Sequence, residues 1–184
     1  MKINIKQIKT KRLLIRRFRK DDLDGIYDYA SREKAARYVL WPRHRSRKDT
    51  KAFLKETFRH YKKGHTFYYA VELVKTGALI GSVGFIPDAE RAAVHGNLEI
   101  GYSFNPGYRG KGYCAEAVKA LIRETFKKLR IRRIQACCNV KNKASERVMK
   151  RAGMKKEGTF RKYMVVKGSI WDIHMYSIIK KGRK

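Results

Sequence analysis

The stretch of this sequence that decides the fold reads Asn105-Pro106-Gly107-Tyr108-Arg109-Gly110-Lys111-Gly112-Tyr113-Cys114-Ala115. It lies between an alternating segment that ends at Phe104 and a helical pattern that begins near Gly112. Gly110 and Gly112 let a ligand approach the backbone without a Cβ in the way. The start of the following helix offers free N–H groups and a partial positive charge, which attract phosphate. The stretch therefore predicts a loop that binds a pyrophosphate group.

The segments on either side of this loop differ in their periodicity. Residues 97–104 alternate between apolar and polar side chains, as a half-buried strand does. The apolar positions are Leu98, Ile100, Tyr102 and Phe104. Over residues 118–129 the apolar side chains recur instead at helical spacing and form a single stripe. The loop is therefore expected to join a strand to an amphipathic helix.

The rest of the chain supplies more elements of both kinds. Strands are predicted over residues 12–18, 67–73, 78–86, 134–140, 160–166 and 170–179. Further helices are predicted over about 21–30, 47–62 and 142–152. The order β-α-α-β-β-β-α-β-α-β-β predicts an α+β fold, with a mixed, mainly antiparallel central sheet flanked by helices. Because no repeat or low-complexity linker interrupts it, residues 1–184 are expected to form one domain.

The composition is strongly basic. Lys and Arg number 46 and Asp and Glu 16, so the formal net charge is +30 at pH 7. A field of this sign attracts polyanions, and it leaves open an association with the ribosome or another RNA through the basic surface. The basic residues are spread along the chain instead of gathering on one element, which is equally typical of a solvated basic shell.

Cysteine usage and hydropathy indicate the cytoplasm. Cys114, Cys137 and Cys138 show no C-x-x-C spacing and no accompanying His pair, so we expect neither disulfides nor a metal site. Residues 1–19 lack the apolar core of a secretory signal. No run approaches the ~20 apolar residues of a membrane span. We therefore expect a cytoplasmic protein with no membrane partner.

Three phosphate-binding patterns compete for the glycine-rich loop. The P-loop needs four residues between its first Gly and Gly-Lys-Ser/Thr, and this spacing is absent. The dinucleotide pattern G-x-G-x-x-G/A matches Gly110–Ala115. That pattern, however, requires a carboxylate at the end of the next strand, and residues 138–142 contain none. It also belongs in the first βαβ unit of its domain, whereas here several predicted elements precede it.

The third pattern is that of the GNAT superfamily of N-acetyltransferases, which the chain resembles over nearly its whole length. Residues 98–104 resemble the family's fourth strand, residues 109–113 its pyrophosphate loop, and residues 116–118 the helix that follows. Asn142–Ser145, together with Gly153-Met154, resemble the later family motif N-x-x-S…G-[FM]. Residues 10–13 and 172–176 resemble the two ends of the branch that includes ribosomal-protein N-terminal acetyltransferases. Gly107 departs from the Gln or Arg that often stands there, but backbone N–H groups do most of the phosphate binding.

The resemblance implies an acyl-CoA N-acyltransferase fold with acetyl-CoA as co-substrate and a primary amine as acceptor. It implies that the pantetheine arm of the CoA pairs with the backbone of Tyr102, Ser103 and Phe104, where the fourth and fifth strands splay apart. It also places the pyrophosphate on Arg109, Gly110, Lys111, Gly112, Tyr113 and Cys114, with Asn142 reaching the pantetheine.

Two residues are candidates for proton transfer. Glu99 shares the Gly101 face of its strand, where it could take the proton of the amine through a water molecule, although a salt-bridged strand carboxylate explains it equally well. Ser145 corresponds to the Ser that lies near the CoA sulfur in the resembled branch. It could protonate the departing thiolate or serve only its own helix. Tyr113 and Tyr163 are alternative proton donors.

The identity of the acceptor stays open between several amines. A basic surface would draw in an acidic protein or one bound to ribosomal RNA, which favours the α-amine of a ribosomal or other protein. A polyamine or an aminoglycoside-type antibiotic is the alternative. A non-catalytic module that binds CoA or RNA on the same fold is the hypothesis of another class. Residues 38–44 are a candidate acceptor segment, and an oligomer is compatible with all these functions.

Overall fold

The structure is a computed structural model that describes residues 3–86 and 97–180. Its strands are β1 (Gln7–Lys9), β2 (Leu13–Arg16), β3 (Tyr68–Leu73), β4 (Leu79–Phe85), β5 (Asn97–Phe104), β6 (Arg133–Asn139), β7 (Lys155–Val166) and β8 (Ser169–Ile179). Its helices are α1 (Leu23–Ala30), α2 (Glu33–Ala36), α3 (Arg47–Lys62), α5 (Tyr113–Lys128) and α6 (Lys143–Arg151), with short 3-10 turns at Lys20–Asp22 and Pro106–Tyr108. None of the helices described is long and apolar enough to cross a membrane.

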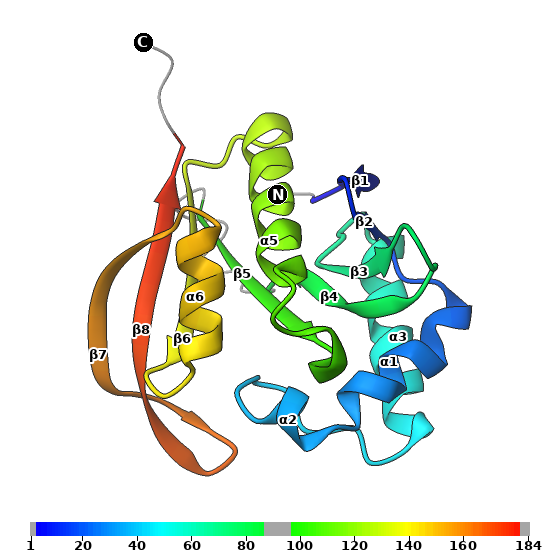
Figure 1. The fold of residues 1–184 in the computed structure, drawn as a ribbon, viewed down its shortest axis with the longest axis horizontal. Helices are drawn as coiled ribbons and strands as arrows, with labels where there is room; N and C mark the ends of the chain where they lie inside the picture. The colour runs from blue at the N-terminus through cyan, green and yellow to red at the C-terminus, as the bar shows by residue number, and fades with distance from the viewer. Residues whose placement is uncertain (1–2, 87–96, 181–184) are drawn as a thin grey trace.

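The strands form one mixed sheet in the order β1-β2-β3-β4-β5-β6-β8-β7. All neighbouring strands are antiparallel except β5 and β6, which run parallel. This is the mixed, mainly antiparallel sheet flanked by helices that the sequence predicted (Figure 1).

The two faces of the sheet carry separate hydrophobic clusters. The alternation of β3 sends Tyr69 and Val71 into the large cluster and Ala70 into the small one. The large cluster contains the apolar stripe of α5, including Val118 and Leu121. The small cluster joins the sheet to α1 and α3. Helices α5 and α6 therefore cover one face, and α1 and α3 cover the other.

The parallel pair β5 and β6 separates soon after it begins. The two strands are paired only over Asn97–Glu99 and Arg133–Gln135. Beyond this point β5 remains paired with β4 as far as Phe104, while β6 remains paired with β8 as far as Asn139. Figure 1 shows the two strands diverging below this pairing. The splayed strands expected from the sequence are thus present, and Glu99 stands where they part.

The sequence missed two elements and placed the start of a third too late, each for an identifiable reason. Strand β1 and helix α2 are too short, at 3 and 4 residues, to show a period. Strand β7 begins at Lys155, five residues before the predicted start, and nearly all of its side chains are exposed. An edge strand whose two faces meet water needs no apolar alternation. The pairing of β7 with β8 also shifts register twice, between Lys156 and Gly158 and between Phe160 and Met164.

Candidate functional site

The glycine-rich loop adopts the backbone conformation that its glycines predict. Gly110 and Gly112 have φ angles of 82° and 79°, in the left-handed region that side chains disfavour. Gly112 is the N-cap of α5. The first backbone hydrogen bond of the helix is donated by the Glu116 N–H to the Gly112 carbonyl oxygen at 3.1 Å. Within the described residues, the N–H groups of 113–115 therefore have no backbone partner. The space beside Gly110 is open, so the loop fits a pyrophosphate group.

Two residues near the N-terminus, Thr10 and Arg12, form hydrogen bonds that fix the shape of this loop. The guanidinium of Arg12 donates to the Lys111 carbonyl at 3.0 Å and to the Glu116 carboxylate at 2.7 Å, and it lies 4.6 Å from the ring centroid of Tyr113. The Thr10 hydroxyl donates to the same carboxylate at 2.6 Å. Burial alone would raise the pKa of Glu116, but the hydrogen bonds from Thr10 and Arg12 outweigh it and lower that pKa. The carboxylate is therefore ionised and anchors the loop.

Arg109 connects the loop to the short helix α2. Its Nη2 donates a hydrogen bond to the carbonyl oxygen of Lys34 at 2.9 Å. The Lys111 ammonium lies 6.0 Å from the Tyr108 ring centroid. Arg109 thus has a structural contact that the sequence did not suggest, in addition to the charge that it brings to the loop.

The predicted pantetheine strand places its side chains on alternating sides. Phe104 is buried in the large cluster, and Ser103 is buried on the other face, where its hydroxyl has no hydrogen-bond partner within the described residues. Beyond Glu99, the edge of β5 that faces β6 is not paired with that strand. An unpaired strand edge offers backbone N–H and C=O groups to an extended ligand, so the strand fits a pantetheine arm.

Tyr102 and Ser145 meet on the α6 side of the splayed strands. Their hydroxyl oxygens lie 2.8 Å apart, and the Tyr102 hydroxyl also donates to the Ser145 carbonyl at 3.2 Å. Burial, followed by the nearby thiol of Cys114, raises the pKa of Tyr102 well above its ordinary value. Tyr102 therefore keeps its proton at neutral pH. Sequence reasoning assigned only the backbone of Tyr102 and missed its hydroxyl, because the contact joins residues far apart in the chain.

The N-terminus of α6 is built as its capping motif predicts. The side-chain oxygen of Asn142 accepts from the Ser145 N–H at 3.2 Å, so Asn142 is the N-cap. This contact fixes the backbone that carries the Ser145 hydroxyl. Of the two alternative donors, Tyr113 lies under Arg12, and Tyr163 packs against Phe160 with their ring centroids 5.3 Å apart.

Glu99 lies on the opposite face of β5 from Tyr102. Gln135 donates to one carboxylate oxygen at 3.2 Å, and the Cys137 thiol donates to the other at 3.5 Å. Both donors come from β6, at the place where the two strands part. These two contacts hold the carboxylate at the gap between the strands.

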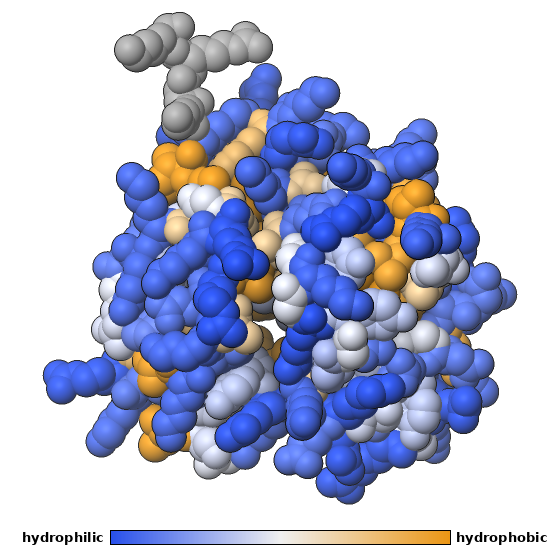
Figure 2. Space-filling view, in the orientation of Figure 1, coloured by the Kyte–Doolittle hydropathy of each residue, from blue (hydrophilic) through white to orange (hydrophobic). Residues whose placement is uncertain are grey.

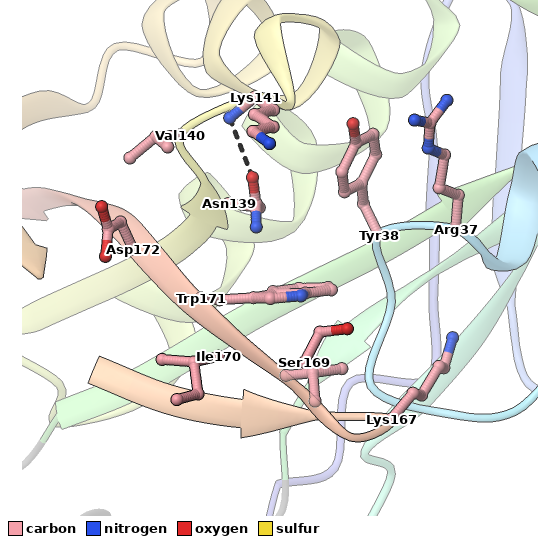
Figure 3. Close-up of a pocket in the computed structure, with 11 residues that line it drawn as sticks. Arg37, Tyr38, Asn139, Val140, Lys141, Lys167, Ser169, Ile170, Trp171 and Asp172 are labelled. Carbon is pink, nitrogen blue, oxygen red and sulfur yellow. Dashed lines mark hydrogen bonds between the residues drawn. The ribbon is translucent and has the colours of Figure 1, made fainter. Parts of the chain in front are cut away.

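A pocket of about 560 Å³ lies between α2, the end of β6 and the hairpin of β7 and β8. Figure 3 shows Tyr38 and Trp171 facing its interior, with ring centroids 6.1 Å apart. Of the candidate acceptor segment 38–44, Tyr38 lines this pocket. Trp41 instead packs with the small cluster of α1 and α3. One end of the candidate acceptor segment 38–44 thus lies in the pocket, whereas Trp41 belongs to the hydrophobic packing of the domain.

Known proteins match the chain along most of its length. Residues 12–155 match the model of the acetyltransferase (GNAT) domain. An uncharacterized N-acetyltransferase of Bacillus subtilis, YnaD, is 35% identical over 95% of this chain and 97% of its own length. A GNAT-family acetyltransferase of Bacillus anthracis has a crystal structure that superposes with a TM-score of 0.83 at 31% identity, covering 94% of this chain and 98% of the other. The [ribosomal protein uS5]-alanine N-acetyltransferase of Escherichia coli is 30% identical over 65% of this chain and 60% of its own length.

Proposed function

The chain belongs to the GNAT family of N-acetyltransferases, and from this premise we propose that it transfers the acetyl group of acetyl-CoA to the α-amine of a protein N-terminus in the cytoplasm. Family membership supplies the reaction class, which is acetyl transfer to an amine. The acceptor, the residues that do the chemistry and the cellular location belong to the proposal.

One observation carries the assignment of the residues. Glu99 and the pair formed by Tyr102 and Ser145 lie on opposite faces of one strand, at the point where β5 leaves β6. A thioester that lies along the open edge of β5 would thus have a carboxylate on one side and a hydroxyl pair on the other. Acetyl transfer needs a base for the amine and a proton for the leaving thiolate, so this arrangement suits both steps.

In the proposed mechanism, Glu99 takes a proton from the acceptor ammonium through a water molecule. The neutral amine then attacks the thioester carbonyl, a new N–C bond forms, and the C–S bond breaks. Ser145 gives its proton to the departing thiolate and regains one from Tyr102 across their hydrogen bond. Solvent takes up the second proton that the acylated nitrogen loses and restores the Tyr102 hydroxyl as the products leave. A backbone N–H of the Ser103–Phe104 stretch polarises the carbonyl oxygen. The glycine loop and the α5 N-terminus hold the pyrophosphate.

Two features support a protein as the acceptor. The net charge of +30 repels a polyamine or an aminoglycoside over long range and attracts an acidic protein or one presented on RNA. Figure 2 shows that hydrophilic residues cover most of the viewed face. The Escherichia coli relative is named for an acceptor that is a ribosomal protein.

A small-molecule amine is the second candidate acceptor. Its support is that the pocket has the volume of a small-molecule site.

The experiment that tests the proposal is a mass-spectrometric screen with the purified enzyme and acetyl-CoA. The panel contains peptides with free N-termini, polyamines and aminoglycosides. We expect the acetyl group on the α-amine of a peptide. Acetylation of the antibiotics or polyamines alone would overturn the choice of acceptor. Calorimetric titration with acetyl-CoA and with RNA at two salt concentrations tests the binding-module alternative, for which RNA would bind and no acceptor would react.

A further inference from the structure

The pocket beside Trp171 lies on the same face of the sheet as Glu99. Along β6 the side chains of Cys137 and Asn139 share one face, and Cys137 contacts Glu99 while Asn139 lines the pocket. Asn139 pairs with Ile173 on β8, so Trp171, two residues before Ile173, points to this face as well. The pocket therefore continues the surface on which the acceptor amine would meet its base.

Two contacts across the open end of the splayed strands build the walls of this pocket. The ring of Tyr38, from the segment after α2, meets Trp171 edge to face at an interplanar angle of 66°. The Lys167 ammonium, from the turn between β7 and β8, donates to the Ala36 carbonyl at 2.6 Å. These contacts hold the α2 segment against the hairpin and leave an aromatic corner between them (Figure 3).

The charges around this corner are mostly positive. Arg37, Lys141 and Lys167 line the pocket together with one carboxylate, that of Asp172. That carboxylate already accepts a hydrogen bond from the Lys162 N–H at 2.7 Å. A cationic ligand would therefore meet three like charges and a carboxylate that is already engaged. Burial lowers the pKa of Lys167 by disfavouring its charged form, and an anion in the pocket would oppose this shift.

Asn139 adds an uncharged donor at the floor of the pocket. Its side-chain oxygen accepts from the Lys141 N–H at 2.9 Å, which turns its NH₂ group the other way. Figure 3 shows that nitrogen directed toward Trp171. Donors and cations thus line one aromatic-walled space, and this combination of groups is the chemistry that binds a carboxylate.

We propose that this pocket binds an acidic side chain of the acceptor, so that the preferred N-termini carry Asp or Glu at the second or third residue. The inference rests on the proposed function and narrows its substrate class. An extended strand rises ~3.3 Å per residue, so Asn139 lies about 7 Å beyond Cys137 along β6. An extended acceptor with its amine at Glu99 spans that distance within its first three residues. The rings of Tyr38 and Trp171 would cover the methylene groups of the acidic side chain.

The test compares peptides that differ only at the second residue, which is Asp, Asn or Lys, at one fixed ionic strength. We expect kcat/KM for the Asp peptide to exceed that for the Asn peptide by about tenfold, the gain of one charge-assisted contact, and the Lys peptide to be the slowest. Free aspartate and glutamate form the small-molecule arm and are expected to react more slowly than the Asp peptide.

Neutralising variants tie the preference to the pocket. In Arg37→Gln and in Lys141→Gln, the ratio of kcat/KM for the Asp peptide to kcat/KM for the Asn peptide should fall to about twofold. Lys119→Gln is the matched control, because it removes the same charge from an exposed position on α5 and should leave the ratio unchanged.

Each outcome bears on one claim alone. Equal rates for the Asp and Asn peptides in the parent enzyme overturn the pocket assignment and leave acetyl transfer to N-termini standing. Faster reaction of the Lys peptide or of free aspartate also overturns it. Absence of acetylation of every peptide and amine contradicts the proposed function itself.

Discussion

The hydroxyl oxygens of Tyr102 and Ser145 lie 2.8 Å apart, across the space between strand β5 and helix α6. Both groups can donate and accept, so a proton that leaves Ser145 can be replaced from Tyr102. The Ser145 backbone is fixed by Asn142, whose side chain caps α6. The geometry thus describes a two-hydroxyl relay on the face opposite Glu99.

The relay predicts that Ser145→Ala lowers kcat by less than the Glu99→Gln change does, because a water molecule can also protonate a thiolate. Tyr102→Phe should have a similar effect, since it removes the group that resupplies the proton. If the two residues act as one unit, the double variant should be little slower than either single variant. Additive losses in a steady-state double-mutant cycle would show that they act separately, and an unchanged rate would return Ser145 to a helix role.

The loop predicts a loss of CoA affinity when a side chain is forced into the left-handed region. We expect Gly110→Val and Gly112→Val each to raise the Kd for acetyl-CoA at least tenfold, about 1.4 kcal/mol. Gly77→Val is the matched control, because Gly77 has a φ of 69° and open space around it but lies in the turn between β3 and β4. Calorimetry on folded variants decides: unchanged affinity in both loop variants would contradict the placement of the pyrophosphate.

The contacts of Arg12 predict an effect on the loop from outside it. Arg12→Ala removes the bonds to Glu116 and Lys111, so acetyl-CoA should bind more weakly and Tm should fall by about 2–4 °C. This ion pair is partly exposed, which keeps the loss small. Arg59→Ala, which breaks an exposed pair with Glu56, should leave CoA binding unchanged. If Arg12→Ala binds acetyl-CoA as the parent does, the anchor is dispensable.

The same cluster predicts a pH dependence. The folded-state pKa of Glu116 is lowered, so its contribution to stability is present above its unfolded pKa and is lost as the pH falls through the folded value. The free energy of unfolding of the parent should therefore exceed that of Arg12→Ala by its full amount at pH 7, and the difference should shrink below about pH 4.3. Urea unfolding at several pH values measures it, and a difference that grows on acidification would contradict the anchor.

The sequence predicted the fold because its strongest periods belong to the elements that build the core. The stripe of α5 and the alternation of β5 both appear in the structure as predicted. The contacts of the candidate site were harder to predict, because they join distant residues. Tyr102 reaches Ser145, and Arg109 reaches Lys34, through packing that no local pattern encodes. The signals available in the sequence for the contacts that hold the glycine-rich loop were Thr10 and Arg12 near the N-terminus and Glu116 in the first turn of α5.

The net charge predicts a salt dependence for the true acceptor. Exposed charges are screened beyond ~10 Å at 0.1 M ionic strength, so kcat/KM for an acidic acceptor should fall steeply between about 20 and about 200 mM salt. Affinity for acetyl-CoA, set mostly by short backbone contacts, should fall less. An uncharged peptide with the same N-terminal residue is the control and should give a nearly flat profile. No salt dependence for the best acceptor would remove the charge argument for a protein substrate.

The central claim is that Glu99 takes the proton of the amine at the gap between the strands. The direct measurement is the single-turnover rate of acetyl transfer at neutral pH in Glu99→Gln, with the Kd for acetyl-CoA taken on the same sample. General-base assistance contributes about 10²–10⁴-fold, so the rate should fall within that range while the Kd stays near that of the parent. Glu56→Gln, an exposed carboxylate on α3, is the control for charge and should be as fast as the parent. A Glu99→Gln rate within about threefold of the parent would contradict the account.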